Sequence, residues 1–437
     1  MPKPRPVRTA ALVLTSALAV LAAVVPAQAQ PGPAGAARAL PVVTPRAETA
    51  TLYDDEAGGN ANADDPAIWR NPADPDRSLV IATAKEGGLR VYDLDARTVQ
   101  KITPPSTGRP DDAPGRFNNV DLVHGLRLPT GRADLAVTTD RGNDRLRFHR
   151  IAPGHRGGPL VDVTDPSVPP VFNRDQDQIN DQRTAYGLAT WTDARTGRSY
   201  ALVSRRERTR VALLELRPTA TGTVTYRTVR TLDLPSSFRL PDGRTWRPCG
   251  EPGELPQIEG MVVDPLNGVL YAGQEDVGIW RVSADLKGTP KLIDKVREYG
   301  VPATYDADTE ECTPGADPGY GGKHLTADVE GLTLVRRGGH GYLLASSQGD
   351  DTFALYDRDV ADRNAYRGGF RIGARDTVLD GSEVCDGAAA FTGPLGRRYP
   401  RGLLVVQDGR ATPAPAGREA TGFKFVDLGT VLDAVRR

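Results

Sequence analysis

The stretch IEGMVVDPLNGVLYAGQEDVGIWRVSAD, residues 258–285, decides the fold. Residues 258–263 are mostly apolar, with an acid followed by a glycine at the second and third positions. Residues 268–276 are mostly apolar and end in two acids. Residues 278–285 alternate between apolar and polar side chains. Short runs of this kind, separated by Pro, Asn and Gly, predict β-strands. Three such strands are too few to bury a core alone, so we expect the unit to pack against copies of itself.

This three-segment unit occurs six times along the chain. Copies of the first segment lie at 64–69, 123–128, 185–191, 258–263, 329–335 and 385–391. Copies of the second lie at 78–85, 133–141, 199–207, 268–276, 341–350 and 402–409, and copies of the third at 88–95, 145–151, 210–216, 278–285, 352–359 and 423–428. A cycle of three or four short strands predicts an all-β fold, a six-bladed β-propeller. The alternative, an array of β-sandwiches in two domains, does not explain repetition without any break in composition.

The N-terminus has the features of an export signal. A basic start containing Lys3, Arg5 and Arg8 precedes an apolar run at 10–25, and the pattern Ala27-Gln28-Ala29 follows. Together these predict a signal peptide over 1–29 and a secreted, extracellular protein, because the apolar run is too short to favour a membrane span. Residues 30–49, rich in Ala and Pro, are expected to form a flexible lead-in, which leaves 50–437 for the propeller.

Charge and cysteine content narrow the possible functions. The chain has 55 Lys and Arg against 56 Asp and Glu, a balance that argues against nucleic acid or an anionic membrane as a partner. Cys249 and Cys312 lie in Gly- and Pro-rich stretches, each before a copy of the first segment. In an oxidising compartment they are candidates for a disulfide that joins two long loops, with Cys385 left unpaired and buried. The alternative is three free thiols.

Acidic and amide residues recur at equivalent positions, around the start of the first segment and the end of the second. In a propeller such positions ring the central channel, and in antiparallel neighbours both lie at the same end. The residues are Asp64, Asp65, Glu259, Glu275, Asp328, Glu330, Gln348 and Asp386, to which Asp380 adds one more six positions before Asp386. Converging carboxylates repel one another unless a hard cation neutralises them, and calcium takes about six to eight oxygen ligands. Zinc is disfavoured, because the chain has only 5 His and its thiols are isolated.

Three basic residues, Lys85, Arg141 and Arg206, lie at the ends of the second segments in the first three repeats. Beside a calcium site they would form a surface for a polyanion, whose oxygens guanidinium groups and metal ions would share. Phosphate esters fit this description, because charge stabilisation and placement of the attacking water are most of the catalytic task. From the residues alone, an alternative is almost equally well supported: the three basic residues only neutralise the acids beside them and bind no ligand.

Several stretches resemble the β-propeller phytases, calcium-dependent enzymes that hydrolyse myo-inositol hexakisphosphate. They occur in family order from about residue 50 to the C-terminus and include ADDPAIW at 63–69, KEGGLRVYDLD at 85–95, GRFNNVDL at 115–122, AYGL at 185–188, LYAGQEDVGIW at 270–280, HLTADVEGL at 324–332 and YLLASSQGDDTFALYDR at 342–358. The resemblance implies a 3-phytase that acts on phytate, calcium-phytate and other inositol phosphates. We expect it to be a monomer.

The resemblance also implies roles for individual residues. The acids that bind several calcium ions would be Asp65, Glu259, Asp328, Glu330, Asp380 and Asp386. Glu275 and Gln348 match polar positions of the same cluster, to which the residue pattern adds Asp64. Lys85, Arg141 and Tyr186 would bind the phosphate that a calcium-bound water attacks, and Arg206 would bind the neighbouring affinity phosphate. Glu259 is the candidate for proton transfer near the leaving oxygen.

The chain departs from the family pattern in several respects. Lys85 is followed by Glu86 where the family often has a second basic residue. Insertions around 235–257 and 297–322 carry Cys249 and Cys312, and we expect them to overhang the site and alter the substrate range.

Two rival hypotheses follow from the same fold. One is another calcium-dependent propeller hydrolase, such as a lactonase or a phosphotriesterase-like enzyme, against which the three cations argue. The other is a non-enzymatic binding propeller, which would not require acids and bases to be segregated on one face.

Overall fold

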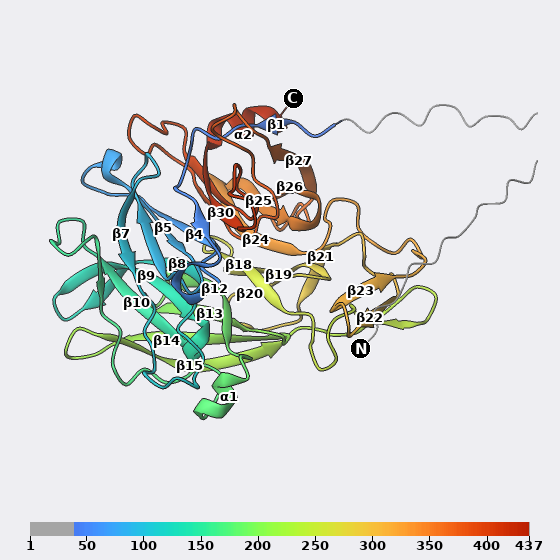
Figure 1. The fold of residues 1–437 in the computed structure, drawn as a ribbon, viewed down its shortest axis with the longest axis horizontal. Helices are drawn as coiled ribbons and strands as arrows, with labels where there is room; N and C mark the ends of the chain where they lie inside the picture. Colours follow the sequence, from blue (N-terminus) through green and yellow to red (C-terminus); the bar gives the residue numbers. More distant parts are fainter. Residues whose placement is uncertain (1–38, 437) are drawn as a thin grey trace, which may run out of the picture. The chain divides into compact units, whose positions relative to one another are not determined.

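The repeated segments form six β-sheets in the computed structural model, which describes residues 39–436 (Figure 1). The predicted signal peptide, residues 1–29, lies outside the described residues. Within each sheet the strands of one repeat are antiparallel and follow one another in chain order, so each repeat is one blade. The prediction of a six-bladed β-propeller is confirmed.

Blades 1 to 3 each contain four strands. Blade 1 is β4 (Pro66–Trp69), β5 (Leu79–Thr83), β6 (Leu89–Tyr92) and β7 (Thr98–Ile102). Blade 2 is β8 (Phe117–Leu128), β9 (Gly131–Asp140), β10 (Arg145–Ile151) and β11 (Leu160–Asp162). Blade 3 is β12 (Ala185–Thr192), β13 (Ser199–Arg205), β14 (Arg210–Pro218) and β15 (Val224–Asp233).

Blade 4 also contains four strands, β18 (Ile258–Asp264), β19 (Val269–Gln274), β20 (Gly278–Ser283) and β21 (Lys291–Lys295).

Blades 5 and 6 also take strands from the N-terminal segment. Blade 5 is β24 (Val329–Arg337), β25 (His340–Ser347), β26 (Thr352–Asp357), β27 (Tyr366–Ile372) and β1 (Val42–Val43). Blade 6 is β28 (Ala388–Phe391), β29 (Leu403–Asp408), β30 (Ala420–Asp427) and β2 (Ala47–Glu48), and β3 (Leu52–Tyr53) also pairs with β30.

The first strands of the blades line the centre of the ring (Figure 1). Each of β4, β8, β12, β18 and β24 contacts the next first strand in order, and β28 contacts β4. The core lies between neighbouring sheets, as where Ile81 and Val91 of blade 1 cluster with Phe117 and Leu160 of blade 2. Apolar faces of adjacent blades therefore hold the ring together.

The N-terminal segment closes the ring. β2 pairs antiparallel with β30 and so completes blade 6, while β1 pairs parallel with β27 of blade 5. The expected flexible lead-in over 30–49 is therefore wrong for its last ten residues, because backbone hydrogen bonds to two blades order them. The compact unit begins at Leu40.

A buried ion cluster supports this closure. Lys424 of β30, whose side chain is 2% exposed, lies 2.6 Å from Glu48 of β2 and 3.1 Å from Asp408 of β29, and also contacts Asp380. Three carboxylates around one buried ammonium group thus connect the N-terminal segment to the last blade.

Two insertions that flank blade 4 are joined to each other. β16 (Phe238–Arg239) pairs with β17 (Thr245–Trp246), and β22 (Ala303–Asp306) pairs with β23 (Glu311–Pro314). Cys249 and Cys312 form the disulfide that the sequence suggests, with their Cα atoms 6.1 Å apart, and Cys385 is a buried free thiol. The rings of Trp246 and Tyr299 lie 4.7 Å apart, centre to centre, within the apolar cluster of blade 4.

Helices are few in the described part of the chain. α1 (Gln176–Asn180) precedes blade 3, and α2 (Leu428–Val435) packs Leu428 and Val431 into the core between blades 5 and 6. Over residues 39–436, no helix has the combined length and apolarity that crossing a membrane requires.

Candidate functional site

Close contact between the innermost strands brings the acidic positions together. Gly187 of β12 lies against the backbone of Glu259, where a Cβ atom would come within 2.2 Å of the Glu259 carbonyl oxygen. Gly260 of β18 lies in the same way against Glu330, at 2.3 Å. The glycine in these first segments therefore lets neighbouring blades approach closely enough for their carboxylates to meet.

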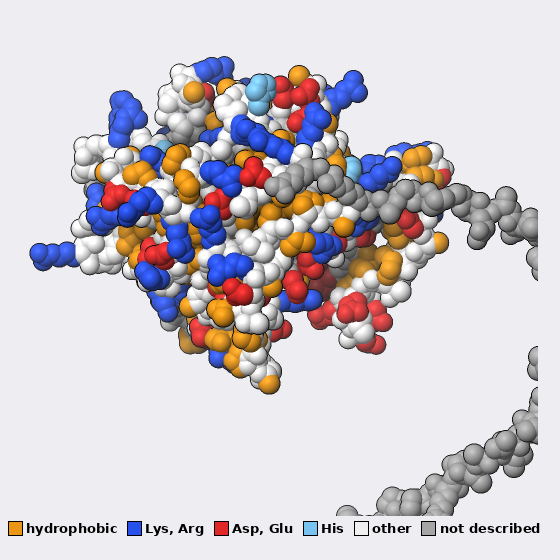
Figure 2. Space-filling view, turned by 90° about the horizontal axis from the view of Figure 1, so that it is seen from above, with side chains coloured by type: hydrophobic (Ala, Val, Ile, Leu, Met, Phe, Trp, Pro, Cys, Tyr) orange, Lys and Arg blue, Asp and Glu red, His pale blue; other side chains and the backbone are white. Residues whose placement is uncertain are grey.

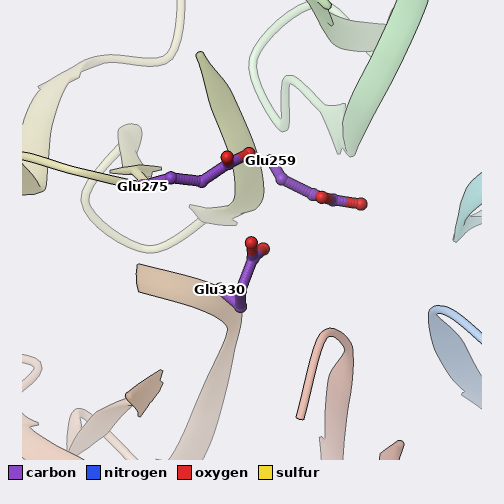
Figure 3. A group of neighbouring side chains, drawn as sticks. All are labelled: Glu259, Glu275 and Glu330. Carbon is purple, nitrogen blue, oxygen red and sulfur yellow. The ribbon is translucent and has the colours of Figure 1, made fainter. Parts of the chain in front are cut away.

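Glu259, Glu275 and Glu330 form a buried carboxylate group where blades 4 and 5 meet (Figure 3). They come from β18, from the residue after β19 and from β24, and one oxygen of each lies within 4.8 Å of the others. Among the residues that the structure describes, Oε1 of Glu275 and Oε2 of Glu330 have no hydrogen-bond partner. On the face shown in Figure 2, acidic and basic side chains are interspersed over much of the surface. The three glutamates, in contrast, bring like charges together in the interior.

Burial and mutual repulsion oppose ionisation of these carboxyl groups. Burial is the largest cause that raises the pKa values of all three glutamates, and repulsion from neighbouring carboxylates adds to it. Burial and then repulsion from Asp328 raise the pKa of Asp276 to about 7, and burial and then repulsion from Asp386 raise that of Asp328 to about 6. Asp276, which is not among the predicted ligands, therefore belongs to the same coupled group. Such a group favours binding of either protons or a cation.

Lys85 connects Asp64 to Asp386 where blades 6 and 1 meet. Its Nζ atom lies 3.4 Å from Oδ2 of Asp386 and 3.9 Å from Oδ2 of Asp64, and Gln348 donates to Oδ1 of Asp386 at 2.5 Å. Burial alone would lower the pKa of Lys85, but the attraction of Asp64 and Asp386 outweighs it and raises that pKa. Within residues 39–436, neither carboxylate oxygen of Asp64 accepts a hydrogen bond, and burial raises the pKa of Asp64 well above the usual range.

Tyr186 and Asn118 join the carboxylates to the cations. The Tyr186 hydroxyl donates to one oxygen of Glu259, and the Asn118 amide donates to the other at 2.7 Å. The Arg141 guanidinium lies 5.6 Å from the centre of the Tyr186 ring. Burial, and then repulsion from nearby guanidinium groups, lowers the pKa of Arg141 to about 10, so this side chain stays charged at neutral pH.

Arg116 is a basic residue of the site that the sequence analysis does not identify. It lies directly before β8, with Nη1 3.9 Å from the carboxylate of Glu86, and its charge acts on both Lys85 and Arg141. It stands in the stretch GRFNN, beside the position where other repeats carry acids, which is the signal that could have revealed it. Arg116 therefore supplies a second cation beside Lys85, although the residue that follows Lys85 in the sequence is the acid Glu86.

Asp65 lies on the other side of its strand from Asp64, because successive residues of an extended chain point to opposite faces. It accepts a hydrogen bond from the backbone N–H of Val120 at 3.0 Å. With Asp121 it lines a cavity of about 320 Å³ enclosed by the first strands of all six blades. Asp65 is thus a residue of the central channel.

The structure separates Asp380 from Asp386, which the sequence analysis groups together. Asp380 accepts hydrogen bonds from the backbone and hydroxyl of Thr412, at 2.5 Å and 2.8 Å, and contacts Lys424. An extended segment of six residues can span about 20 Å, so six positions in sequence do not ensure that two side chains share a site. Asp380 belongs to the ion cluster that closes the ring.

Arg206 lies at the edge of the site, where it pairs with Glu207. It lines a cavity of about 210 Å³ that extends to Glu275. Gln257 lines the same cavity and donates to Oε2 of Glu275 at 2.9 Å and to the Tyr186 hydroxyl at 3.3 Å. Gln257 is a second residue that the sequence analysis misses, although it directly precedes the IEGM motif.

Comparisons with known proteins identify relatives of this chain. The sequence profile of the phytase family matches residues 9–239 and 254–436. A 3-phytase of Bacillus subtilis strain 168 is 31% identical over 362 residues, which cover 82% of this chain and 78% of the relative.

Among solved structures the likeness is weaker. A calcium-binding protein, regucalcin, of Agrobacterium tumefaciens is 11% identical, with a TM-score of 0.44 over 89% of this chain and 97% of that chain. A periplasmic gluconolactonase of Pseudomonas aeruginosa is 15% identical, with a TM-score of 0.38 over 70% of each chain. Likeness at this level carries no argument about function.

Proposed function

Because the chain belongs to the β-propeller phytase family, we propose that it is an extracellular, calcium-dependent phytase that releases phosphate from myo-inositol hexakisphosphate by attack of water on phosphorus. One observation carries the proposal: Tyr186 stands between the buried carboxylate of Glu259 and the guanidinium of Arg141. Carboxylates alone would hold a cation, and basic groups alone would bind a polyanion. Their junction suits a phosphate ester bound together with a metal ion.

The residues present fit calcium. Glu259, Glu275 and Glu330 could hold a metal ion, and several neighbouring oxygens, including both of Asp64, are buried with no hydrogen-bond partner in the described part of the chain. An all-oxygen donor set of flexible geometry suits calcium rather than zinc. The residues that would hold calcium here are Asp64, Glu259, Glu275, Asp328, Glu330, Gln348 and Asp386, with Asp65 facing the channel. When bound, calcium would neutralise these carboxylates, withdraw charge from phosphate oxygens and lower the pKa of the attacking water.

The basic residues would bind and orient the phosphate group that is cleaved. Lys85, Arg116 and Arg141 come from blades 1 and 2 and border the carboxylate group. Their donors would bind the equatorial phosphate oxygens, where negative charge is greatest in the transition state. Arg206, at the neighbouring cavity, would bind a second phosphate of the same inositol ring.

Tyr186 and Glu259 would control protons near the leaving oxygen. Burial and then nearby carboxylates raise the pKa of Tyr186 well above its usual range, so it remains a hydroxyl and holds Glu259 in place by donating to it. Burial raises the pKa of Glu259, which strengthens this carboxylate as a proton acceptor. As water adds to phosphorus and the bond to the inositol oxygen breaks, one proton has to pass from that water to the leaving oxygen, and Glu259 would relay it.

Secretion is part of this proposal. It is supported by the disulfide Cys249–Cys312, which persists in oxidising compartments, and by the sequence of residues 1–29. The monomeric state stays a prediction.

The direct test is phosphate release from calcium-phytate, with and without an excess of EGTA. We expect release that stops in the chelator and returns when calcium, but not magnesium, is added back. Absence of release, or release untouched by chelation, would contradict the proposal.

A further inference from the structure

A cleft of about 230 Å³ lies between blades 1 and 2, away from the carboxylate group. Its walls come from β7 and the loop after it, from the first residue of β8, and from β10 and β11. The lining residues are Gln100, Ile102, Thr103, Pro105, Phe117, Arg147, His149, Leu160 and Asp162.

His149 lines this cleft and is buried, with only 3% of its surface exposed. Within residues 39–436, Nδ1 of its ring has no hydrogen-bond partner. Burial lowers the pKa of His149 to about 4, against the attraction of Asp162, so the ring is neutral at neutral pH. One nitrogen of a neutral imidazole donates and the other accepts, and leaving such groups unpaired away from water is unfavourable. A ligand with a polar group would therefore find a partner in His149.

Arg147 lies on the same face of β10 as His149, because side chains two residues apart in a strand point the same way. Its Nε atom donates to the buried carboxylate of Asp140 at 2.9 Å. In the part of the chain that the structure describes, no other nitrogen of this guanidinium donates to a protein acceptor. Its Nη groups are therefore available to a ligand in the cleft.

The rest of the lining is largely apolar and is fixed in place. Phe117 and Leu160 are buried, and Ile102 is half-buried beside them in the same apolar cluster. Gln100 connects the two blades, because its Nε2 donates to the carbonyl oxygen of Leu160 at 3.0 Å and its Oε1 accepts from the N–H of Leu160 at 2.8 Å. The cleft is thus preformed, with one apolar side and one polar side, as small-molecule sites commonly are.

The charges at the cleft favour an uncharged ligand. Asp162 lies opposite His149 in the pairing of β11 with β10 and is exposed. A carboxylate or phosphate ligand would meet this negative charge, while the guanidinium of Arg147 is already neutralised by Asp140. An ammonium ligand would in turn meet Arg147. A neutral hydroxyl group avoids both penalties and can donate and accept at once.

We propose that the cleft beside His149 is a binding site for a small neutral molecule with an apolar body and one hydroxyl group. The hydroxyl would donate to the unprotonated nitrogen of His149 and accept from Arg147, while the apolar body would pack on Phe117 and Leu160. A cavity of about 150 Å³ can already hold benzene, whereas drug-sized ligands need about 300–1,000 Å³, so the cleft suits a single substituted ring. This site is independent of the proposed function, because no phosphate ester or calcium takes part in it.

The test compares three probes of similar shape on the full-length protein with calcium: benzyl alcohol, toluene and benzoate. Calorimetric titration measures affinity, and the ring nitrogen resonances of ¹⁵N-labelled histidine show which ring responds. We expect benzyl alcohol to bind with a dissociation constant of about 1 mM or lower and to shift the His149 resonances. Toluene, which lacks the hydroxyl, and benzoate, which meets Asp162, should each bind about ten-fold or more weakly.

His149→Phe keeps a ring in the same place but removes both nitrogens. It should weaken binding of benzyl alcohol about ten-fold and leave toluene binding as tight or tighter. His340→Phe, at an exposed position of β25, is the matched control and should titrate like the wild type.

The comparison of the three probes on the wild type does not depend on how well the variant folds. No binding of benzyl alcohol at about 10 mM would mean that water alone fills the cleft, and it would overturn the proposal. Equal affinities for the three probes, or binding that leaves the His149 resonances unchanged, would also overturn it. The same titrations in EGTA should give the same affinities, whereas loss of binding without calcium would place the ligand elsewhere and contradict the assignment.

Discussion

The hydroxyl of Tyr186 donates to the carboxylate of Glu259 across the contact between blades 3 and 4. Gly187, the next residue, makes this possible, because its lack of a side chain lets β12 approach the backbone of Glu259. On its other side Tyr186 meets the guanidinium of Arg141. One side chain therefore joins the acidic and basic parts of the site.

Replacing Arg141 by Ala should lower kcat for phytate by about 10²–10³-fold, the scale of losing one preorganised donor to the transition state. The melting temperature should change little, because the Arg141 side chain is only half-buried and forms no ion pair within residues 39–436. Phosphate release and thermal unfolding, measured on the same preparation, check this. Arg156→Ala, in the exposed loop between β10 and β11, is the matched control and should have full activity. An active Arg141→Ala enzyme would remove this residue from the cleavage site.

Calcium should stabilise the protein more at about pH 7.5 than at about pH 5. The pKa values of Asp276 and Asp328 are raised to about 7 and about 6 in the folded protein, so it binds protons that the unfolded chain loses near pH 4. In the calcium-free protein, the contribution of these two groups to the free energy of unfolding is thus greatest at low pH. It is lost as the pH rises through 6 and 7. Calcium removes that penalty by replacing the protons.

Thermal unfolding in EGTA and in excess calcium, at both pH values, measures this difference. The shift in melting temperature caused by calcium should be clearly larger at the higher pH. The same shift at both pH values would mean that these carboxyl groups do not take part in calcium binding.

Gly260→Ala should destabilise the protein by about 1–3 kcal/mol, the usual cost of overpacking a close contact. The added methyl group would come within 2.3 Å of the Glu330 carbonyl oxygen, and the two strands would have to separate. Calcium affinity should fall as well, because Glu259 and Glu330 would move apart. Denaturant unfolding and calcium titration measure both effects. Gly154→Ala, where nothing lies within 4 Å of the added group, provides the control.

Lys424→Met should cost about 3–5 kcal/mol, because it leaves three carboxylates without their buried cation. The pairing of β2 with β30 should weaken, so hydrogen exchange should become faster in residues 42–48 before other regions respond. Lys287→Met removes a surface ion pair with Asp285, in which the lysine side chain is 67% exposed, and should change stability by less than about 1 kcal/mol. Equal stabilities of the two variants would argue against an ion cluster that closes the ring.

Much of the fold could be predicted from the sequence, because strands buried on both sides keep a clear apolar pattern. β5, β19 and β29, for example, lie inside the predicted second segments and are almost entirely buried. The outer strands are less visible: β7 (TVQKI) is mostly exposed, so little selection for apolar residues marks it. The two-residue strands β1 and β2 pair with residues more than 320 positions away, and no local pattern can reveal such pairing.

Site residues could be predicted from the sequence where they occupy equivalent positions in successive repeats. Glu259 and Glu330 share one register in consecutive blades, and the glycine that follows each indicates the close approach. The surroundings of Asp380 could not be predicted, because it lies in a loop. In a loop, the distance between two residues in the sequence says little about the directions of their side chains. Arg116 and Gln257 were missed because their roles depend on how side chains reach across blade boundaries, which repeats alone do not specify.

The most direct measurement is phosphate release from phytate as calcium is titrated into chelator-treated protein, with the wild type and Glu330→Gln side by side. Glutamine keeps the size of the side chain but removes its charge. We expect no release without calcium, a rise to full activity in the wild type, and a similar rise in Glu330→Gln only at about ten-fold or more higher calcium. Activity of the wild type that is independent of calcium, or identical titrations of the two proteins, would contradict it.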